Sequence, residues 1–289
     1  MKQVSFSIDI EVNESDFSLE QTLECGQCFR FYKIGNNEYV VIAQNTYIRV
    51  EQRGNILKLF CTQEEYERIW KIFFDLDRDY GKIKELLKEK DPFLKEAIMQ
   101  KHGVHILKQE PFEMLLSFIL SQNKQIPHIK KLIEGISSKY GNYLGECEGI
   151  SCYSFPTLKQ LKAVTEEEFR QLKTGFRAPY LVDAIKQIDQ GIILLDSLYG
   201  VSYLEAKQCL MGVRGVGEKI ADCVLLYAYG RYEVFPTDVW VKRVVEHYYF
   251  DEPQKMDKIQ EFAKYYFGDY AGFAQQYLFY YARDNKIGK

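Results

Sequence analysis

Two glycines separated by one residue, Gly215 and Gly217, interrupt an apolar run and constrain this 289-residue chain more than any other feature. Glycine adopts positive φ and permits close backbone approach. We therefore expect one helix to end near Met211, the chain to turn sharply, and a second helix to begin at Gly217 or Glu218. The free N–H groups at the start of the second helix would form an anion site, and phosphate is the usual anion at such sites.

Three chemically capable side chains follow this turn. Lys219 and Cys223 are four residues apart, which places them on one face of the second helix. Asp238 follows Pro236 and Thr237 and is positioned to cap a further helix. A lysine, a cysteine and an aspartate around a phosphate-binding turn indicate a candidate catalytic site.

The composition indicates a folded protein without a membrane span. Hydrophobic residues make up 46% of the chain and aromatic residues 15%, and no run of about 18 apolar residues occurs. The N-terminus lacks an apolar signal segment, so we expect a soluble, cytoplasmic protein. The net charge of −3 argues mildly against a nucleic-acid binder. Helix N-termini and backbone amides can nevertheless hold phosphates with few cationic side chains.

The odd number of cysteines, together with the absence of an export signal, predicts reduced thiols. The pair Cys25-x-x-Cys28 has no second pair at finger-like spacing, so zinc binding is the minor interpretation and no side-chain metal site is predicted. His102-x-x-His105 is the only close histidine pair, and we expect it at the surface. The seven cysteines are Cys25, Cys28, Cys61, Cys147, Cys152, Cys209 and Cys223.

The periodicity predicts an α+β fold whose N-terminal lobe, residues 1–90, is an antiparallel sheet of about five strands. Alternation begins at Val4–Ile10, and turn signals at residues 35–37 and 53–55 separate the later strands. A helix from Gln63 to about Phe74 would cover this sheet.

The rest of the chain, residues 91–289, predicts a mainly α-helical region. Its hairpin would span about residues 203–229, and the active site would lie in the cleft between the two lobes. The helices expected from periodicity and capping signals cover residues 81–90, 92–101, 110–122, 127–140, 157–163, 165–174, 177–190 and 203–211.

The hairpin and the Pro236-Thr237-Asp238 segment closely resemble the helix-hairpin-helix motif with its Gly-Pro-Asp region, which marks a superfamily of base-excision DNA glycosylases. The segment Gly26-Gln27-Cys28-Phe29-Arg30 resembles the G-Q-x-F-R run of the 8-oxoguanine DNA glycosylase family. This resemblance implies that the Gly26 carbonyl accepts a hydrogen bond from N7–H of the damaged base. Guanine has a lone pair at N7 instead, so it would leave the Gly26 carbonyl without a donor. An unsatisfied buried carbonyl costs about 1–3 kcal/mol.

The same resemblance assigns the remaining site residues. Gln275 would bind the Watson–Crick edge of the extruded base, while Phe279 and Cys223 would enclose its ring. On residue chemistry alone, an aromatic stripe on a last helix is more often core. The DNA contacts implied by the family are Asn123, Lys124, His128, Phe176, Arg177, Gly215, Gly217 and Ile220.

The chemistry implied is base excision with strand cleavage. The damaged base is flipped out, Asp238 stabilises positive charge at C1′, and Lys219 attacks C1′ to form a Schiff base. The alternatives are an alkylated-base glycosylase, which needs no lysine, and a non-catalytic helix-hairpin-helix protein.

The expected partner is double-stranded DNA containing 8-oxoguanine, bound by a monomer without a membrane. No cofactor is required. A structural monovalent cation could bind the backbone of Met211, Val213 and Val216 on the hairpin.

Overall fold

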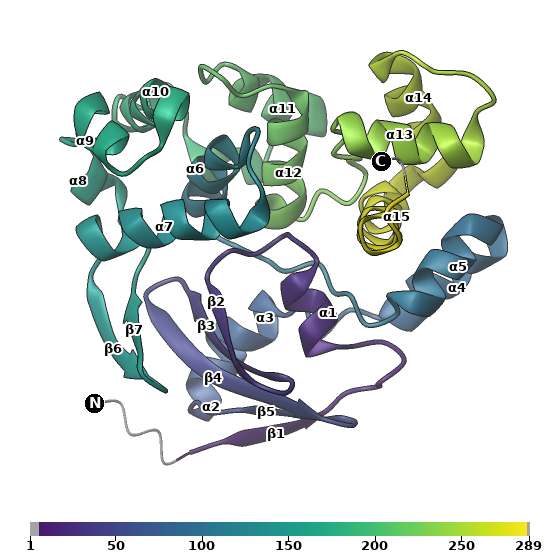
Figure 1. Ribbon diagram of the computed structural model, residues 1–289, viewed down its shortest axis with the longest axis horizontal. Coiled ribbons are helices and arrows are strands. Elements are labelled where there is room, and N and C mark those ends of the chain that lie inside the picture. Colours follow the sequence, from purple (N-terminus) through teal and green to yellow (C-terminus); the bar gives the residue numbers. More distant parts are fainter. Residues whose placement is uncertain (1–5, 288–289) are drawn as a thin grey trace.

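The computed structural model describes residues 6–287 and divides into a β lobe and a larger helical region (Figure 1). The β lobe contains a five-stranded antiparallel sheet with the strand order β1-β5-β4-β3-β2. The α+β prediction is therefore confirmed. The strands are β1 (Ile8–Glu11), β2 (Phe31–Gly35), β3 (Glu38–Ala43), β4 (Thr46–Arg53) and β5 (Ile56–Leu59).

The turns and the covering helix of the sheet follow from local sequence. Asn37 and Gly54 have φ values of 54° and 59°, at the two turns predicted between strands. Thr62 caps the covering helix through a capping box, as expected. The helix is continuous from α2 (Gln63–Glu65) through a π-helical turn to α3 (Lys71–Phe73), and its buried face packs on the sheet.

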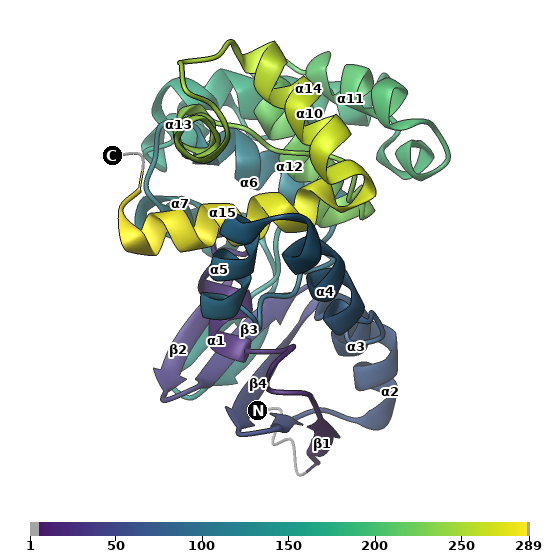
Figure 2. The ribbon, with the colours of Figure 1, turned by 90° about the vertical axis from the view of Figure 1, so that its right-hand side faces the viewer.

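The helical region begins with two helices beside the β lobe and ends with a long helix that crosses the molecule. Figure 2 shows α15 passing between α13 and the α4–α5 pair. No helix within residues 6–287 is long and apolar enough to cross a membrane. The helices of eight residues or more are α4 (Tyr80–Lys90), α5 (Pro92–Gln100), α6 (Pro111–Ser121), α7 (Ile126–Tyr140), α10 (Ala178–Asp189), α11 (Tyr203–Met211), α12 (Glu218–Tyr229), α13 (Val239–Tyr249), α14 (Met256–Phe267) and α15 (Ala271–Asn285).

The second helix of the hairpin, α12, is the centre of the helical core. Every residue from Ile220 to Tyr229 is buried, and α12 packs along α6, whose residues from Met114 to Leu120 are also buried. The rings of Phe118 and Tyr227 stack between these helices at a centroid distance of 5.5 Å. This packing fixes the N-terminus of α12, and therefore Lys219, relative to α6.

One expectation about this region was wrong, and one element was missed. His105 is not at the surface: it is 4% exposed, stacks on Tyr80 at 3.6 Å and lies 2.9 Å from the Phe74 carbonyl through Nδ1. The segment that follows His105 runs between the two lobes. The Lys108 N–H donates to the Phe73 carbonyl, and the Gln109 N–H donates to the Tyr227 carbonyl.

The missed element is a two-stranded hairpin below α7, formed by β6 (Tyr143–Cys147) and β7 (Ile150–Tyr153). Glu148 and Gly149 both have positive φ at its turn. The first strand of the main sheet is also shorter than expected, because it begins at Ile8, while Val4 and Ser5 of the predicted strand lie outside the described residues.

Candidate active site

The hairpin turn requires glycine at Gly215 and leaves the backbone open at Gly217. Gly215 has a φ of +83°, and an added Cβ would lie 2.3 Å from the Tyr180 ring. Gly217 caps α12 without a side chain, and an added Cβ there would meet no heavy atom within 4 Å. Because Gly217 has no side chain, it does not cap the first N–H groups of α12, and N–H groups at a helix start can bind a phosphate.

Lys219 and Cys223 are four residues apart on α12, and Asp238 lies at the start of the next helix, α13. Lys219 is half-buried, and its Nζ lies 5.2 Å from the centroid of the Phe118 ring. Cys223 is 4% exposed, and burial raises the pKa of its thiol to about 11. The Lys219 charge lowers that pKa, and the Asp222 and Asp238 carboxylates raise it. A pKa of that size keeps Cys223 a neutral thiol at pH 7, and it forms no ion pair with Lys219.

Asp238 caps α13, as the sequence predicts. One of its carboxylate oxygens accepts the Val241 N–H at 2.7 Å. The capping bond fixes the carboxylate at the start of α13. A carboxylate held this way can stabilise a cation without reorganising.

Gly26 of the β lobe and Phe279 of α15 meet on the other side of the site. Gly26 has a φ of +99°, and an added Cβ would lie 3.6 Å from Phe279 Cε1 and 3.1 Å from Ile126 Cδ1. The Phe279 ring makes an edge contact with Trp240 at 5.3 Å. Gln275 is 4% exposed, and its Oε1 has no hydrogen-bond partner among residues 6–287. A buried, unpartnered acceptor is unfavourable unless a ligand satisfies it.

The Gly26 loop is held by the amide side chain that follows it. Gln27 is fully buried, and its Nε2 donates to the carbonyls of Thr22 and His105. Its Oε1 accepts the Leu107 N–H at 2.9 Å, and its own carbonyl accepts from the Gln109 side chain. These bonds use both donors of the Gln27 amide and engage its oxygen, so the loop is rigid where Gly26 follows α1 (Leu19–Glu24).

Phe118 joins the two sides of the site. Besides carrying Lys219 over its ring, it makes an edge contact of 5.8 Å with Phe29, three residues after Gly26. The lesion loop predicted in the β lobe and the lysine predicted in the hairpin are therefore linked through a single aromatic ring.

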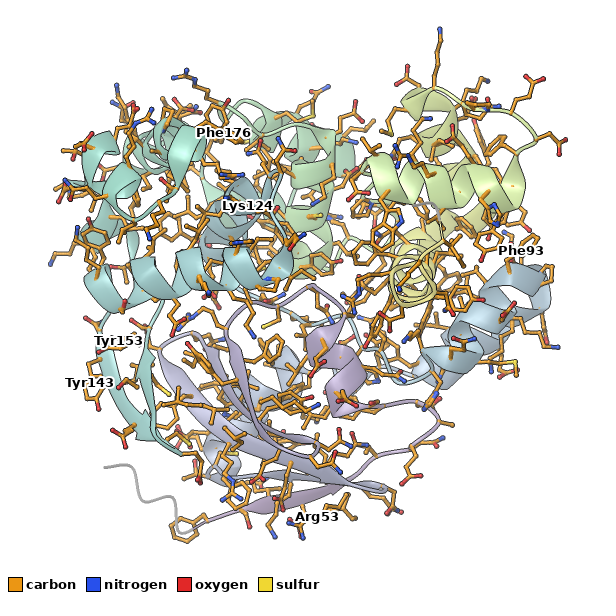
Figure 3. All side chains as sticks on the ribbon, viewed as in Figure 1. Arg53, Phe93, Lys124, Tyr143, Tyr153 and Phe176 are labelled. Carbon is orange, nitrogen blue, oxygen red and sulfur yellow. The ribbon has the colours of Figure 1, made fainter. Side chains whose placement is uncertain are left out.

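The residues predicted to face DNA lie at the α6–α7 turn and at residues 175–177. Asn123, Lys124 and His128 are exposed, and Asn123 has a φ of 50°. Phe176 is 46% exposed, and Figure 3 shows it with Lys124 on the helical region.

Arg177 and Ile220 occupy different environments from these exposed residues. Arg177 is 2% exposed, and its guanidinium donates to the carbonyls of Thr174 and Gln122. It thus ties the 175–177 turn to the loop that carries Asn123. Ile220 is 5% exposed and packs in the helical core, so only its backbone, in the first turn of α12, is near the anion site.

Side-chain metal ligands do not cluster in the part of the chain that the structure describes. Within residues 6–287, no group of three or more histidine, cysteine, aspartate or glutamate side chains could hold a metal ion. Met211, Val213 and Val216, whose carbonyls are the predicted ligands of a monovalent cation, lie at the hairpin turn, where the Val213 carbonyl accepts the Val216 N–H at 3.0 Å.

Two residues near the site had not been singled out from sequence. Arg283, one turn after Phe279 on α15, lies beside Gly26. Lys207 of α11 forms a buried ion pair with Asp222 of α12. Helical spacing from Phe279 could have indicated Arg283, but nothing local to the sequence indicates the Lys207 pair.

Comparison with family models covers nearly the whole chain. Residues 9–115 match the N-terminal domain of 8-oxoguanine DNA glycosylase, and residues 116–266 match the HhH-GPD superfamily of base excision DNA repair proteins. The chain belongs to the 8-oxoguanine DNA glycosylase family. Gly26 falls in the first match and the hairpin with Asp238 in the second, whereas Gln275 and Phe279 lie beyond residue 266.

The chain is similar to solved structures and to a curated relative over more than nine-tenths of its length. The chain is 43% identical to MBOgg1 in complex with a low affinity DNA ligand, with a TM-score of 0.93 over 97% of this chain and 96% of that one. It is 39% identical to the Clostridium acetobutylicum 8-oxoguanine glycosylase/lyase in complex with double-stranded DNA containing cytosine opposite 8-oxoguanine, with a TM-score of 0.93 and coverage of 98% and 97%. The Arabidopsis thaliana N-glycosylase/DNA lyase OGG1 is 28% identical, over 93% of this chain and 78% of the relative.

Proposed function

We propose that this protein flips 8-oxoguanine out of duplex DNA and removes it with Lys219 as nucleophile and Asp238 as the supporting carboxylate. The reaction class follows from the family: the chain is an 8-oxoguanine DNA N-glycosylase and DNA lyase. The proposal assigns its steps to residues. The observation that supports it is that Lys219 lies in the first turn of α12, directly after the glycine turn, while the Asp238 carboxylate is held by its capping bond at the start of α13.

Base recognition is assigned to residues from both ends of the chain. The Gly26 carbonyl would accept N7–H, which 8-oxoguanine has and guanine lacks. The unpartnered Oε1 of Gln275 would accept from the N–H groups of the Watson–Crick edge. Phe279 and Cys223 would cover the two ring faces, and the neutral thiol suits that role because it brings no charge against the base.

The chemical steps can be written with each bond accounted for. The Lys219 amine attacks C1′ while the bond from C1′ to the base nitrogen breaks, and the departing base takes up a proton. Asp238 stabilises the positive charge that develops at C1′. Loss of a proton from nitrogen and opening of the sugar give a Schiff base, which acidifies the C2′ proton. Removal of that proton expels the 3′ phosphate and cuts the strand.

The DNA would be held mainly through its backbone and by filling the gap left by the base. The open N–H groups at Gly217 would bind a phosphate, and exposed Lys124 and His128 would add positive charge. Asn123, exposed at the tip of its turn, would enter the duplex beside the orphaned partner base. We further propose that the protein acts as a monomer.

A monovalent cation at the hairpin is a separate proposal. The Val213 carbonyl accepts one hydrogen bond and retains a second lone pair, so the turn can still offer an oxygen ligand. Such an ion, held with the carbonyls of Met211 and Val216, would stiffen the phosphate-binding turn. No chemical step depends on it.

Borohydride trapping tests the nucleophile directly. A Schiff base between enzyme and duplex containing 8-oxoguanine is reduced to a stable covalent complex. We expect Lys219→Gln to abolish trapping and to slow strand cleavage by at least about three orders of magnitude. Lys264→Gln, on the exposed side of α14, is the matched control and should trap normally. Trapping that survives Lys219→Gln would show that another amine is the nucleophile.

A further inference from the structure

Arg283 places its guanidinium beside Gly26 and Phe279. It follows Phe279 by four residues on α15 and therefore lies on the same helix face. Its Nη1 would lie 3.7 Å from a Cβ built on Gly26, at the point where Phe279 Cε1 would lie 3.6 Å away. The guanidinium stacks over the Tyr280 ring at 4.5 Å, and the side chain is 25% exposed.

The positive charge of Arg283 is only partly balanced by its neighbours. Its Nε donates to Asp284 at 3.2 Å, but that carboxylate also pairs with Lys101. The Asp284 carboxylate thus pairs with two cations, Lys101 and Arg283. The Nη1 end points towards Gly26, where the other close atoms, Ile126 Cδ1 and Phe279 Cε1, are apolar. A guanidinium donor in such a setting gains most from an oxygen acceptor that enters the pocket.

We propose that Arg283 is a second lesion-reading residue. Its guanidinium donates a hydrogen bond to the C8 carbonyl oxygen of the extruded base, next to N7, while the Gly26 carbonyl accepts a hydrogen bond from N7–H. This inference rests on the proposed function, because it needs the damaged base beside Gly26. An acceptor and a donor side by side on the protein are complementary to a donor and an acceptor side by side on 8-oxoguanine. Guanine has a lone pair at N7 and cannot donate a hydrogen bond to the Gly26 carbonyl.

The test compares two duplexes, one with 8-oxoguanine and one with a preformed abasic site. Arg283→Met should slow single-turnover excision of 8-oxoguanine about 10- to 100-fold, the loss expected for one charge-assisted hydrogen bond. Cleavage at the abasic site should stay within about twofold of the unaltered protein, because no base is present to be read. Lys286→Met, which removes an exposed cation at the end of the same helix, should leave both rates unchanged.

The possible outcomes distinguish base reading from other roles of Arg283. Equal slowing of both reactions by Arg283→Met would mean that the guanidinium binds DNA phosphate or supports the fold, and unchanged excision would mean that it reads nothing; either result overturns the proposal. Arg283→Lys keeps the charge without the planar fork and should retain part of the excision rate at full abasic-site activity. If the unaltered protein fails to trap on the abasic duplex, the proposed function fails, irrespective of Arg283.

Discussion

The Gly26 loop and the hairpin face the same site but are held in place by opposite means. Gln27 fixes the loop with neutral amide hydrogen bonds to Thr22, His105 and Leu107. The hairpin is held by charge, because Lys207 of α11 contacts both Asp222 and Glu218 of α12. In the proposed function the loop presents a carbonyl to a neutral base, and the bonds that hold the loop involve no ion. In the proposed function the hairpin binds phosphate and supports a developing cation, so ionic contacts suit it.

This difference also separates recognition from reaction. In the proposed function Gly26 acts through its backbone carbonyl, whose position depends on the residues that fold the loop. The proposed catalytic groups Lys219 and Asp238 would act through side chains at two helix N-termini. Changes to the loop should therefore affect which base is removed, and changes to the hairpin should affect stability and chemistry for any substrate.

The largest expected effect is a loss of stability when the ion pair that holds the hairpin is broken. Asp222 is fully buried and its ion-pair partner Lys207 nearly so. Lys207→Met leaves a buried carboxylate with no counter-ion, which costs about 3–5 kcal/mol in the free energy of unfolding. Urea denaturation at pH 7 measures it. The double variant Lys207→Met/Asp222→Leu removes both charges and should recover most of the loss. A single variant as stable as the unaltered protein would refute the idea that charge holds the hairpin.

The next largest effect is a pH-dependent change in stability through His105, whose carbonyl helps to hold the Gly26 loop. Burial lowers the pKa of His105 from 6.5 to about 4. The unfolded chain therefore binds the proton at higher pH than the folded protein does. The stability that His105 contributes is complete above pH 6.5 and is lost as pH falls towards 4, by about 3 kcal/mol at most.

Unfolding free energies measured between pH 7 and pH 4 test this point. Carboxylates also contribute to acid instability, so the difference between the unaltered protein and His105→Gln isolates the histidine. The variant should show the flatter profile. Parallel profiles for the two proteins would mean that His105 does not titrate between the folded and unfolded states as its burial predicts.

Sequence predicted those parts of the site that depend on short-range rules. The glycine turn, the capping by Asp238 and the helical spacing of Lys219 and Cys223 each depend on a few adjacent residues, and the structure has the turn and the cap as expected. The alternating strands and their glycine or asparagine turns are equally local, which is why the β lobe was also predicted.

The remaining features depend on contacts between distant segments. His105 was predicted to be a surface residue because its burial arises from Tyr80 and Phe74, which the local pattern does not include. The Lys207–Asp222 pair depends on how α11 packs on α12. Gly26 and Arg283 come from opposite ends of the chain and meet only because α15 crosses between the lobes (Figure 2).

The smallest substitution tests the separation of recognition from reaction most directly. Gly26→Ala adds one methyl group at a φ of +99°, 3.1 Å from Ile126 Cδ1, and so displaces the carbonyl. We predict that excision of 8-oxoguanine falls about 10- to 100-fold, while Lys219-dependent cleavage at a preformed abasic site keeps its rate. If both rates fall by the same factor in a folded protein, Gly26 shapes the whole active site, and recognition and reaction are not separate.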